Sequence, residues 1–205
     1  QCIQSMPDAS PTKWHLAHSS WFFEAMVLGP LALGYLPFDE RFSYLFNSYY
    51  EALGPRHPRP QRGLLTRPTL GQVQAYRANL DAAVQRFISG SDEAVWQQAL
   101  PLLTLGLHHE QQHQELMQTD ILHALSCNPL LPAYHLAEAP ALRLAPSVAP
   151  LRWLTGPAGV AQVGHGGGFA FDNEIPRHRV LLSPYRVSDR LFNCGEYLQF
   201  IEDGG

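Results

Sequence analysis

The chain has 205 residues, of which 45% are hydrophobic and 16% are charged, so it is long enough to bury the core of one large domain or of one and a half smaller ones. Its formal net charge of −4 and its 14 scattered basic residues argue against nucleic acid or an anionic membrane as a partner, because neither would meet a strongly positive surface. The most apolar stretch, "WFFEAMVLGPLALGYLPF", is interrupted by Glu24, Gly29, Pro30 and Gly34, so we expect no segment that crosses a membrane.

The cysteines and histidines give information about the redox setting of the protein and about metal binding. Cys2, Cys127 and Cys194 are odd in number, far apart and without a C-x-x-C pair, which argues against a disulfide framework and against a thiolate zinc site. We therefore expect a reducing, cytoplasmic setting. Ten histidines are a high count for this length, and imidazole is the commonest metal ligand.

The first half of the chain predicts helices. "DASPTKWHLAHSSWFFEAMVL" predicts a helix over about residues 11–28, with Ser10 as its cap. The basic loop "GPRHPRPQRGLLTRPT" follows, and its four prolines exclude regular structure over much of its length. Apolar residues spaced by three and four then predict an amphipathic helix over 69–89. A further helical region is expected over about 92–126, divided by its one proline.

The composition changes after residue 127. Residues 128–150 are rich in proline and alanine, which is typical of an extended linker. Beyond them "RHRVLLSPYRV" is typical of strands and "NCGEYLQFIEDGG" of a short helix. We therefore expect an all-α bundle over 1–127 and the opening of a separate α+β or β-rich domain over 151–205. A segment so short and rich in glycine does not close a core by itself, so the chain is expected to be cut short, and its start inside a loop also looks cut.

The stretch "LGLHHEQQHQELMQTD", residues 105–120, carries the strongest functional signal. His109 and His113 are four residues apart, so on a helix both imidazoles lie on one face and can bind a single ion. The same letters match the H-E-x-x-H pattern of zinc proteases, in which Glu110 would be the general base. A merely solvated helix face stays an alternative for the pair taken alone.

A third histidine is available on the first predicted helix. In "WHLAHSSWFFE", His18 is in phase with Phe22 and Ala25 on the stripe expected to face the bundle, whereas His15 lies nearer the start of the helix. A single histidine in a core is usually structural. Joined with His109 and His113, however, His18 would complete three neutral imidazoles on one side of a metal and leave positions open for substrate.

Five segments together resemble the sulfoxide synthases of ergothioneine biosynthesis, the EgtB type, which are relatives of the ovothiol enzymes. They are "SMPDASPTKWHLAHSSWFFE", "FNSYYEALG", "RPQRGLLTRPT", "LGLHHEQQHQEL" and "FAFDNEIPRHRVLL". The resemblance implies a mixed α and α/β fold: a DinB-like four-helix metal-binding domain over 1–127, a linker over 128–150 and, over 151–205, the first part of a domain similar to formylglycine-generating enzymes, which are sulfatase-modifying and C-type-lectin-like.

The resemblance also implies a cofactor and a reaction. Iron(II) would be held by His18, His109 and His113. Dioxygen would be used to join the sulfur of cysteine or γ-glutamylcysteine to the imidazole ring of hercynine (Nα-trimethylhistidine) as a sulfoxide. Three neutral ligands leave the ion its full positive charge, which suits an anionic thiolate. The family's remaining hercynine contacts belong to the C-terminal domain, so inactivity of this chain by itself is an open outcome.

Further residues receive roles, each with a plainer alternative. Tyr49 and Tyr50 resemble a tyrosine pair of the family branch that uses free cysteine, where a phenol acts as general acid; the alternative is packing. Arg56 and Arg59 match arginines that hold the carboxylate of the sulfur donor; the alternative is a solvated basic loop. Gln112 lies beside the histidine pair and could hydrogen-bond the substrate or a water, or simply solvate the helix.

In the last segment, the sequence departs from the family at "RLFNCGEY", where relatives more often read P-V-T-N-G-E-Y. Cys194 stands in place of a commoner residue and is expected to serve packing. His165 and His178 are expected to be structural.

Two other function classes stay open. A DinB-type metal-dependent thiol transferase, or a non-catalytic metal-binding bundle, could use the same three histidines without a second domain. A zinc peptidase would need Glu110 aimed at a metal-bound water and a further ligand downstream, and "QQHQELMQTD" offers no motif of the known types.

Overall fold

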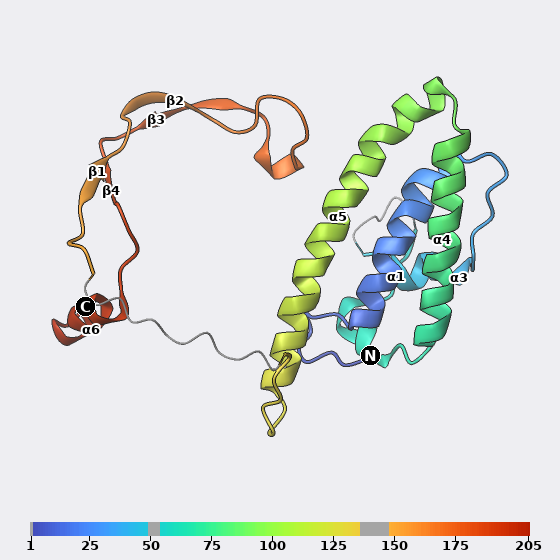
Figure 1. Cartoon of the computed structure of the whole chain (residues 1–205), viewed down its shortest axis with the longest axis horizontal. Coiled ribbons are helices and arrows are strands. Elements are labelled where there is room, and N and C mark those ends of the chain that lie inside the picture. The colour runs from blue at the N-terminus through green and yellow to red at the C-terminus, as the bar shows by residue number, and fades with distance from the viewer. Residues whose placement is uncertain (1, 49–53, 136–147) are drawn as a thin grey trace. The chain divides into compact units, whose positions relative to one another are not determined.

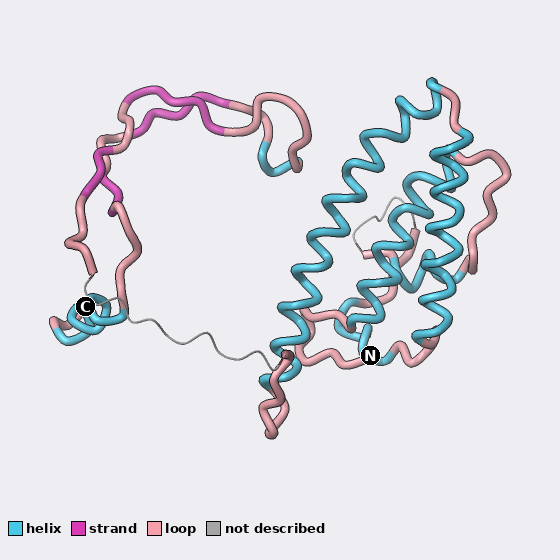
Figure 2. The backbone as a smooth tube through the Cα atoms, viewed as in Figure 1, coloured by secondary structure: helices cyan, strands magenta, loops and turns pink. Residues whose placement is uncertain are grey.

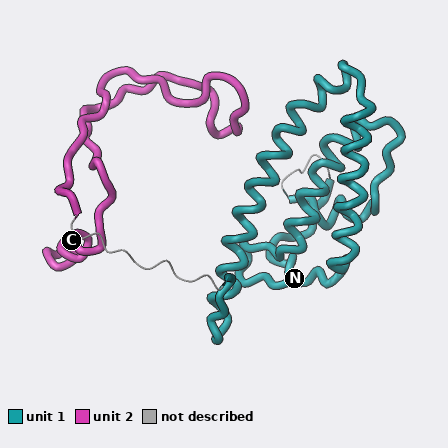
Figure 3. Tube along the Cα trace, viewed as in Figure 1, with its two compact units in different colours: residues 1–137 teal, residues 138–205 magenta. Residues whose placement is uncertain are grey.

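The computed structural model describes residues 2–48, 54–135 and 148–205. The chain divides into two compact units, Gln1–Ala137 and Glu138–Gly205 (Figure 3). The first unit is helical, and the second contains short antiparallel strands and one helix (Figure 2). A mixed helix and strand composition, as expected from the sequence, is therefore confirmed. The division falls among the residues expected to form a linker.

Helix α1 (Thr12–Phe23) runs without a break into the π-helical turn η1 (Glu24–Leu28) and the short α2 (Gly29–Leu31). The helical run is thus longer than expected. The assignment of Ser10 as its cap is wrong, because Pro11 occupies the cap position and no side chain caps the helix. The Ser10 hydroxyl instead accepts a hydrogen bond from Arg62.

Two long helices complete the first unit. Helix α4 (Leu70–Gly90) confirms the predicted amphipathic helix and starts at a capping box formed by Thr69 and Gln72. Helix α5 (Glu93–Ser126) starts at Asp92, whose carboxylate accepts from the amide of Val95.

The expected division of α5 at its proline is wrong, because Pro101 lies inside one continuous helix. Proline removes one backbone hydrogen bond from a helix. The residues on either side of it, Ala99 and Leu103, are anchored in the core of the first unit, and this packing holds the helix together across the defect.

Helix α1 lies between α4 and α5 and contacts both (Figure 1). The short helix α3 (Arg41–Phe46) also packs on α1, and the basic loop contains a 3-10 turn, η3 (Arg59–Leu64). Most of α1 is buried, including polar residues, which are Lys13, His15, His18, Ser19 and Ser20. Buried polar side chains are costly unless they have partners, so they mark α1 as the helix around which a site is built.

The second unit forms two antiparallel ribbons. Strand β1 (Trp153–Thr155) pairs with β4 (Arg186–Ser188), and β2 (Gly159–Val163) pairs with β3 (His178–Leu182). The 3-10 turn η4 (Asp172–Glu174) lies between β2 and β3 in the sequence, and helix α6 (Cys194–Glu202) follows β4. No residue of 148–205 is buried, in agreement with the expectation that this segment closes no core of its own. Across the described residues, no helix combines the length and the apolar character needed to cross a bilayer.

Candidate metal centre

Three histidines of the first unit meet at one point. His18 comes from α1, and His109 and His113 come from successive turns of α5. Each offers one ring nitrogen, and these three atoms all lie within 4.8 Å of one another. Among the residues that the structure describes, no other cluster of this kind is found. The spacing of four on α5 and the burial of α1 thus produce the group that the sequence indicated.

Helices α1 and α5 approach each other closely at a glycine near the three histidines. A Cβ atom at Gly106, one turn before His109, would collide with the ring of Phe23 and would lie 3.1 Å from the ring of Phe22. Only a residue without a side chain fits between these aromatic rings. The close approach of α5 to α1 therefore depends on Gly106.

Two of the three ligand nitrogens have the separation that an ion would require. The Nδ1 atom of His18 donates to the carbonyl oxygen of Phe46, so its Nε2 carries the lone pair. That Nε2 lies 3.2 Å from Nε2 of His109. A metal–nitrogen bond of about 2.1 Å would place two neighbouring ligand nitrogens about 3.0 to 3.4 Å apart, and the observed separation lies in this range. The histidines therefore fit a metal ion.

Aromatic rings pack against two of the imidazoles. His18 is stacked between Trp14 and Trp21, with ring centroids 4.5 Å and 5.7 Å away. The ring of Phe22 lies 4.7 Å from that of His109. The Nδ1 atom of His109 is buried and has no hydrogen-bond partner in the described part of the chain.

Burial keeps these imidazoles neutral at neutral pH. Loss of hydration is the largest cause in each case: it lowers the pKa of His18 well below its usual value, that of His109 to about 4 and that of His113 to about 3. It also lowers the pKa of His15, against the opposite effect of the Asp120 carboxylate. Neutral imidazole is the form that binds metal ions, so the electrostatics of the site favour ligation.

A cavity of about 460 Å³ opens beside the three histidines. Its wall includes Gln112, which the sequence suggested as a substrate contact, and two arginines, Arg59 and Arg62. Such a cavity is large enough for a small polar ligand.

Arg62 is the residue of this wall that sequence reasoning missed. Its guanidinium is buried and lies over the ring of Trp14, 3.4 Å from the ring centroid. It donates to the hydroxyl oxygens of Ser10 and Ser48, both at 3.0 Å. Nothing in the sequence distinguishes Arg62 from the other arginines of the loop, because its role depends on how η3 packs on α1. The cation is fixed in place before any ligand arrives.

The other expected residues have different positions. Arg59 lines the cavity and donates to the carbonyl oxygen of Asp8, whereas Arg56 donates to the carbonyl oxygen of Ser48 and is not among the residues that line it. Tyr49 and Tyr50 lie outside the described residues.

In the second unit, His165 and His178 make local hydrogen bonds to the carbonyl oxygens of Gly167 and Pro176. The expectation that Cys194 serves packing is wrong for the described structure. Its side chain is exposed at the start of α6, because this unit buries none of its described residues.

Glu110, the general base of the peptidase hypothesis, points elsewhere. Its carboxylate oxygens lie 3.2 Å and 3.3 Å from Nη1 of Arg77 on α4. It is not among the residues that line the cavity beside the histidines. A carboxylate held by an arginine on another helix is not placed to activate a water at the centre.

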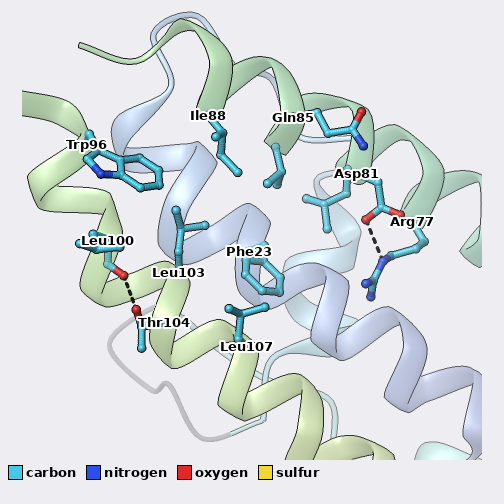
Figure 4. A pocket seen from close by; sticks show the side chains of 12 residues that line it. Phe23, Arg77, Asp81, Gln85, Ile88, Trp96, Leu100, Leu103, Thr104 and Leu107 are labelled. Carbon is cyan, nitrogen blue, oxygen red and sulfur yellow. Dashed lines mark hydrogen bonds and ion pairs between the residues drawn. The ribbon is translucent and has the colours of Figure 1, made fainter. Parts of the chain in front are cut away.

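A second cavity of the first unit, about 450 Å³, is apolar (Figure 4). It lies between α4 and α5, where Leu80, Trp96 and Leu103 line it, and the ion pair of Arg77 and Asp81 stands at its edge. It contains no histidine or cysteine. This cavity offers a surface for apolar contact, with a few polar side chains in its wall.

No protein-family model matches the chain, and no curated protein matches it significantly.

Proposed function

We propose that the chain is the metal-binding part of an iron(II)- and oxygen-dependent sulfoxide synthase of the ergothioneine type. In this proposal the first unit is a DinB-like bundle, and the second is the beginning of a domain similar to formylglycine-generating enzymes. The observation that carries it is the group His18, His109 and His113, three neutral imidazoles without a carboxylate, beside a cavity that holds a buried arginine.

The ligand set supports an open, redox-capable site. Three imidazoles suit iron and other first-row ions and leave coordination positions for reactants. Iron(II) bound there would supply the binding and reduction of dioxygen and the binding of a thiolate. In the overall reaction, hercynine loses a ring hydrogen, the thiol loses its hydrogen, one oxygen atom of dioxygen enters the sulfoxide and the other leaves as water.

Residues of the cavity wall would bind the two organic substrates. Arg62 presents a guanidinium already oriented by Ser10, Ser48 and Trp14, and Arg59 lies on the same wall. We therefore assign the carboxylate of the sulfur donor to Arg59 and Arg62 in place of Arg56 and Arg59. The amide of Gln112 could hydrogen-bond the hercynine ring. Tyr49 and Tyr50 stay candidates for the proton donor.

A metal-dependent thiol transferase, or a bundle that only binds metal, is the second candidate. One observation favours it: all three histidines and the residues that line the cavity belong to the first unit. The zinc peptidase is disfavoured because Glu110 is paired with Arg77.

The test uses the full-length protein. It is titrated with iron(II) without oxygen and then exposed to air with hercynine and either cysteine or γ-glutamylcysteine, and the products are analysed by mass spectrometry. A sulfoxide with either donor supports the proposal, and the preferred donor identifies the family branch. Iron binding without any sulfoxide would favour the second candidate, and absence of iron binding would overturn both.

A further inference from the structure

A chain of hydrogen bonds leads from a carboxylate to one of the three histidines. The Oδ2 atom of Asp120 on α5 lies 3.0 Å from Nε2 of His15 on α1. The Nδ1 atom of His15 lies 2.8 Å from Nδ1 of His113. Asp120 also accepts from the backbone amide of Ser10 at 2.8 Å. The side chain of His15 is only 3% exposed and that of Asp120 13%.

The direction of each proton follows from the donors and acceptors. A carboxylate only accepts, so the proton of a neutral His15 sits on Nε2 and its Nδ1 carries a lone pair. Two ring nitrogens 2.8 Å apart form a hydrogen bond only if one of them donates, so Nδ1 of His113 carries a proton. The remaining nitrogen of His113, Nε2, is then the atom with a lone pair for an ion.

We infer that Asp120 and His15 are positioning residues of the metal centre, which fix His113 in the tautomer that presents Nε2 as ligand. The inference rests on the metal-binding half of the proposed function and is independent of the C–S chemistry. Ligand histidines usually donate their other ring nitrogen to a carboxylate or a carbonyl, and losing such a partner typically weakens metal binding 10- to 100-fold. In this chain the carboxylate acts through a second imidazole.

Both helices carry these residues at helical spacing. Asp120 lies two turns after His113 on α5, and His15 lies one turn before His18 on α1. The faces that supply the ligands therefore also supply the residues that orient one of them. The carbonyl oxygen of Phe46 fixes the tautomer of His18 in the same way, because it accepts from Nδ1 and leaves Nε2 as the ligand atom.

The first experiment measures the affinity of the chain for cobalt(II), whose absorption spectrum also reports ligand geometry. His15→Leu should weaken binding 10- to 100-fold and change the spectrum. His15→Gln should recover most of the affinity, because an amide can accept from His113 and donate to Asp120. Asp120→Asn keeps an acceptor but removes the charge. Its cobalt(II) affinity should lie between those of His15→Leu and His15→Gln. Glu115→Gln alters an exposed carboxylate of the same helix and serves as the matched control.

The second experiment reads the tautomers in the wild-type protein. Nitrogen NMR of the histidine rings in the zinc-loaded chain should show a proton on Nδ1 of His113 and on Nε2 of His15. Because it needs no substitution, it decides the question even if His15→Leu does not fold.

Three outcomes are decisive against the inference. Ligation of zinc through Nδ1 of His113 overturns it, and so does a folded His15→Leu variant with wild-type cobalt affinity and spectrum. In both cases the proposed function would stand. A wild-type chain that binds neither ion overturns the proposed function and the inference with it.

Discussion

Helices α1 and α5 both supply ligands to the histidine centre, but they differ in how far they are buried. Most of α1 is inaccessible to solvent, whereas α5, almost three times as long, buries Ala99, Leu103, Gly106 and His113. On α1 the ligand His18 is therefore held by packing from several sides. On α5, His113 is held by its hydrogen bond to His15 and His109 by contact with Phe22, on a helix with few buried residues. This contrast predicts different responses to substitution.

The largest effect is expected from removing one ligand on each helix. His18→Ala and His113→Ala should each weaken iron(II) or cobalt(II) binding by more than about 100-fold, beyond the cost of losing only a partner of a ligand. The two should differ in the metal-free protein. His18→Ala leaves a hole between Trp14 and Trp21 and should lower the free energy of unfolding by about 2 to 4 kcal/mol, whereas His113→Ala, at the cavity, should cost less.

These variants are compared by metal titration and by urea unfolding in the presence of a chelator. His108→Ala is the matched control, since His108 is next to His109 in the sequence and outside the cluster. Equal losses of metal-free stability in the two ligand variants would refute the contrast between the helices.

The next effect concerns pH and involves the ligands of α5. His109 and His113 have folded-state pKa values of about 4 and about 3, so the unfolded chain binds more protons than the folded chain below pH 6.5. Stability of the metal-free protein should therefore fall as the pH drops from 6.5 towards 4, by roughly 2 kcal/mol for each histidine at pH 5.

Unfolding curves in chelator at pH 7, 6 and 5 measure this loss. The double variant His109→Gln, His113→Gln should reduce the dependence and leave the part that comes from His18 and His15. A wild-type stability that stays constant over this range would show that the imidazoles are not buried as described.

A smaller effect is expected at the contact between α1 and α5. Gly106→Ala would force a methyl group against Phe23 and should lower the free energy of unfolding by about 1 to 3 kcal/mol. It should also weaken metal binding, because α5 would move away from α1. Gly71→Ala on α4, where a Cβ meets nothing within 4 Å, is the control and should be neutral or slightly stabilising. Equal thermal melts for the two variants would contradict the close contact.

The smallest effect is expected at the exposed proline of α5. Pro101→Ala restores a backbone hydrogen bond and should raise the free energy of unfolding by about 1 kcal/mol or more, with little change in metal affinity because the ligands lie two turns away or further. A loss of stability would mean that the proline itself packs in the core.

The sequence predicted the features that depend on local spacing. The pair His109 and His113 and the amphipathic α4 follow from periodicity that neighbouring residues impose. Strands β3 and β4 follow from the β-branched and aromatic character of "RHRVLLSPYRV", whereas β1 and β2 were not predicted. The structure also brings His18 to the α5 pair, as expected from its phase on the buried stripe.

Features that depend on contacts between distant segments were harder to predict. His15 and Asp120 are 105 residues apart and become neighbours only when α1 packs on α5. Their spacing from His18 and His113 was a usable signal that sequence reasoning did not use. Which arginine of the loop lines the cavity depends on how η3 packs on α1. That α5 continues through Pro101 depends on the packing of the residues on either side of it. The roles given to Tyr49, Tyr50, Arg59 and Gln112 stay predictions.

The stacking of Trp14 on His18 also gives the protein an optical property. The indole ring lies 4.5 Å from the imidazole that would hold the ion, and Trp21 flanks the same ring on α1. Open-shell ions such as iron(II) and cobalt(II) quench indole emission at such short range, whereas zinc has a filled d shell and does not. The intrinsic fluorescence of the unlabelled chain should therefore distinguish which kind of ion occupies the centre and report its arrival in real time.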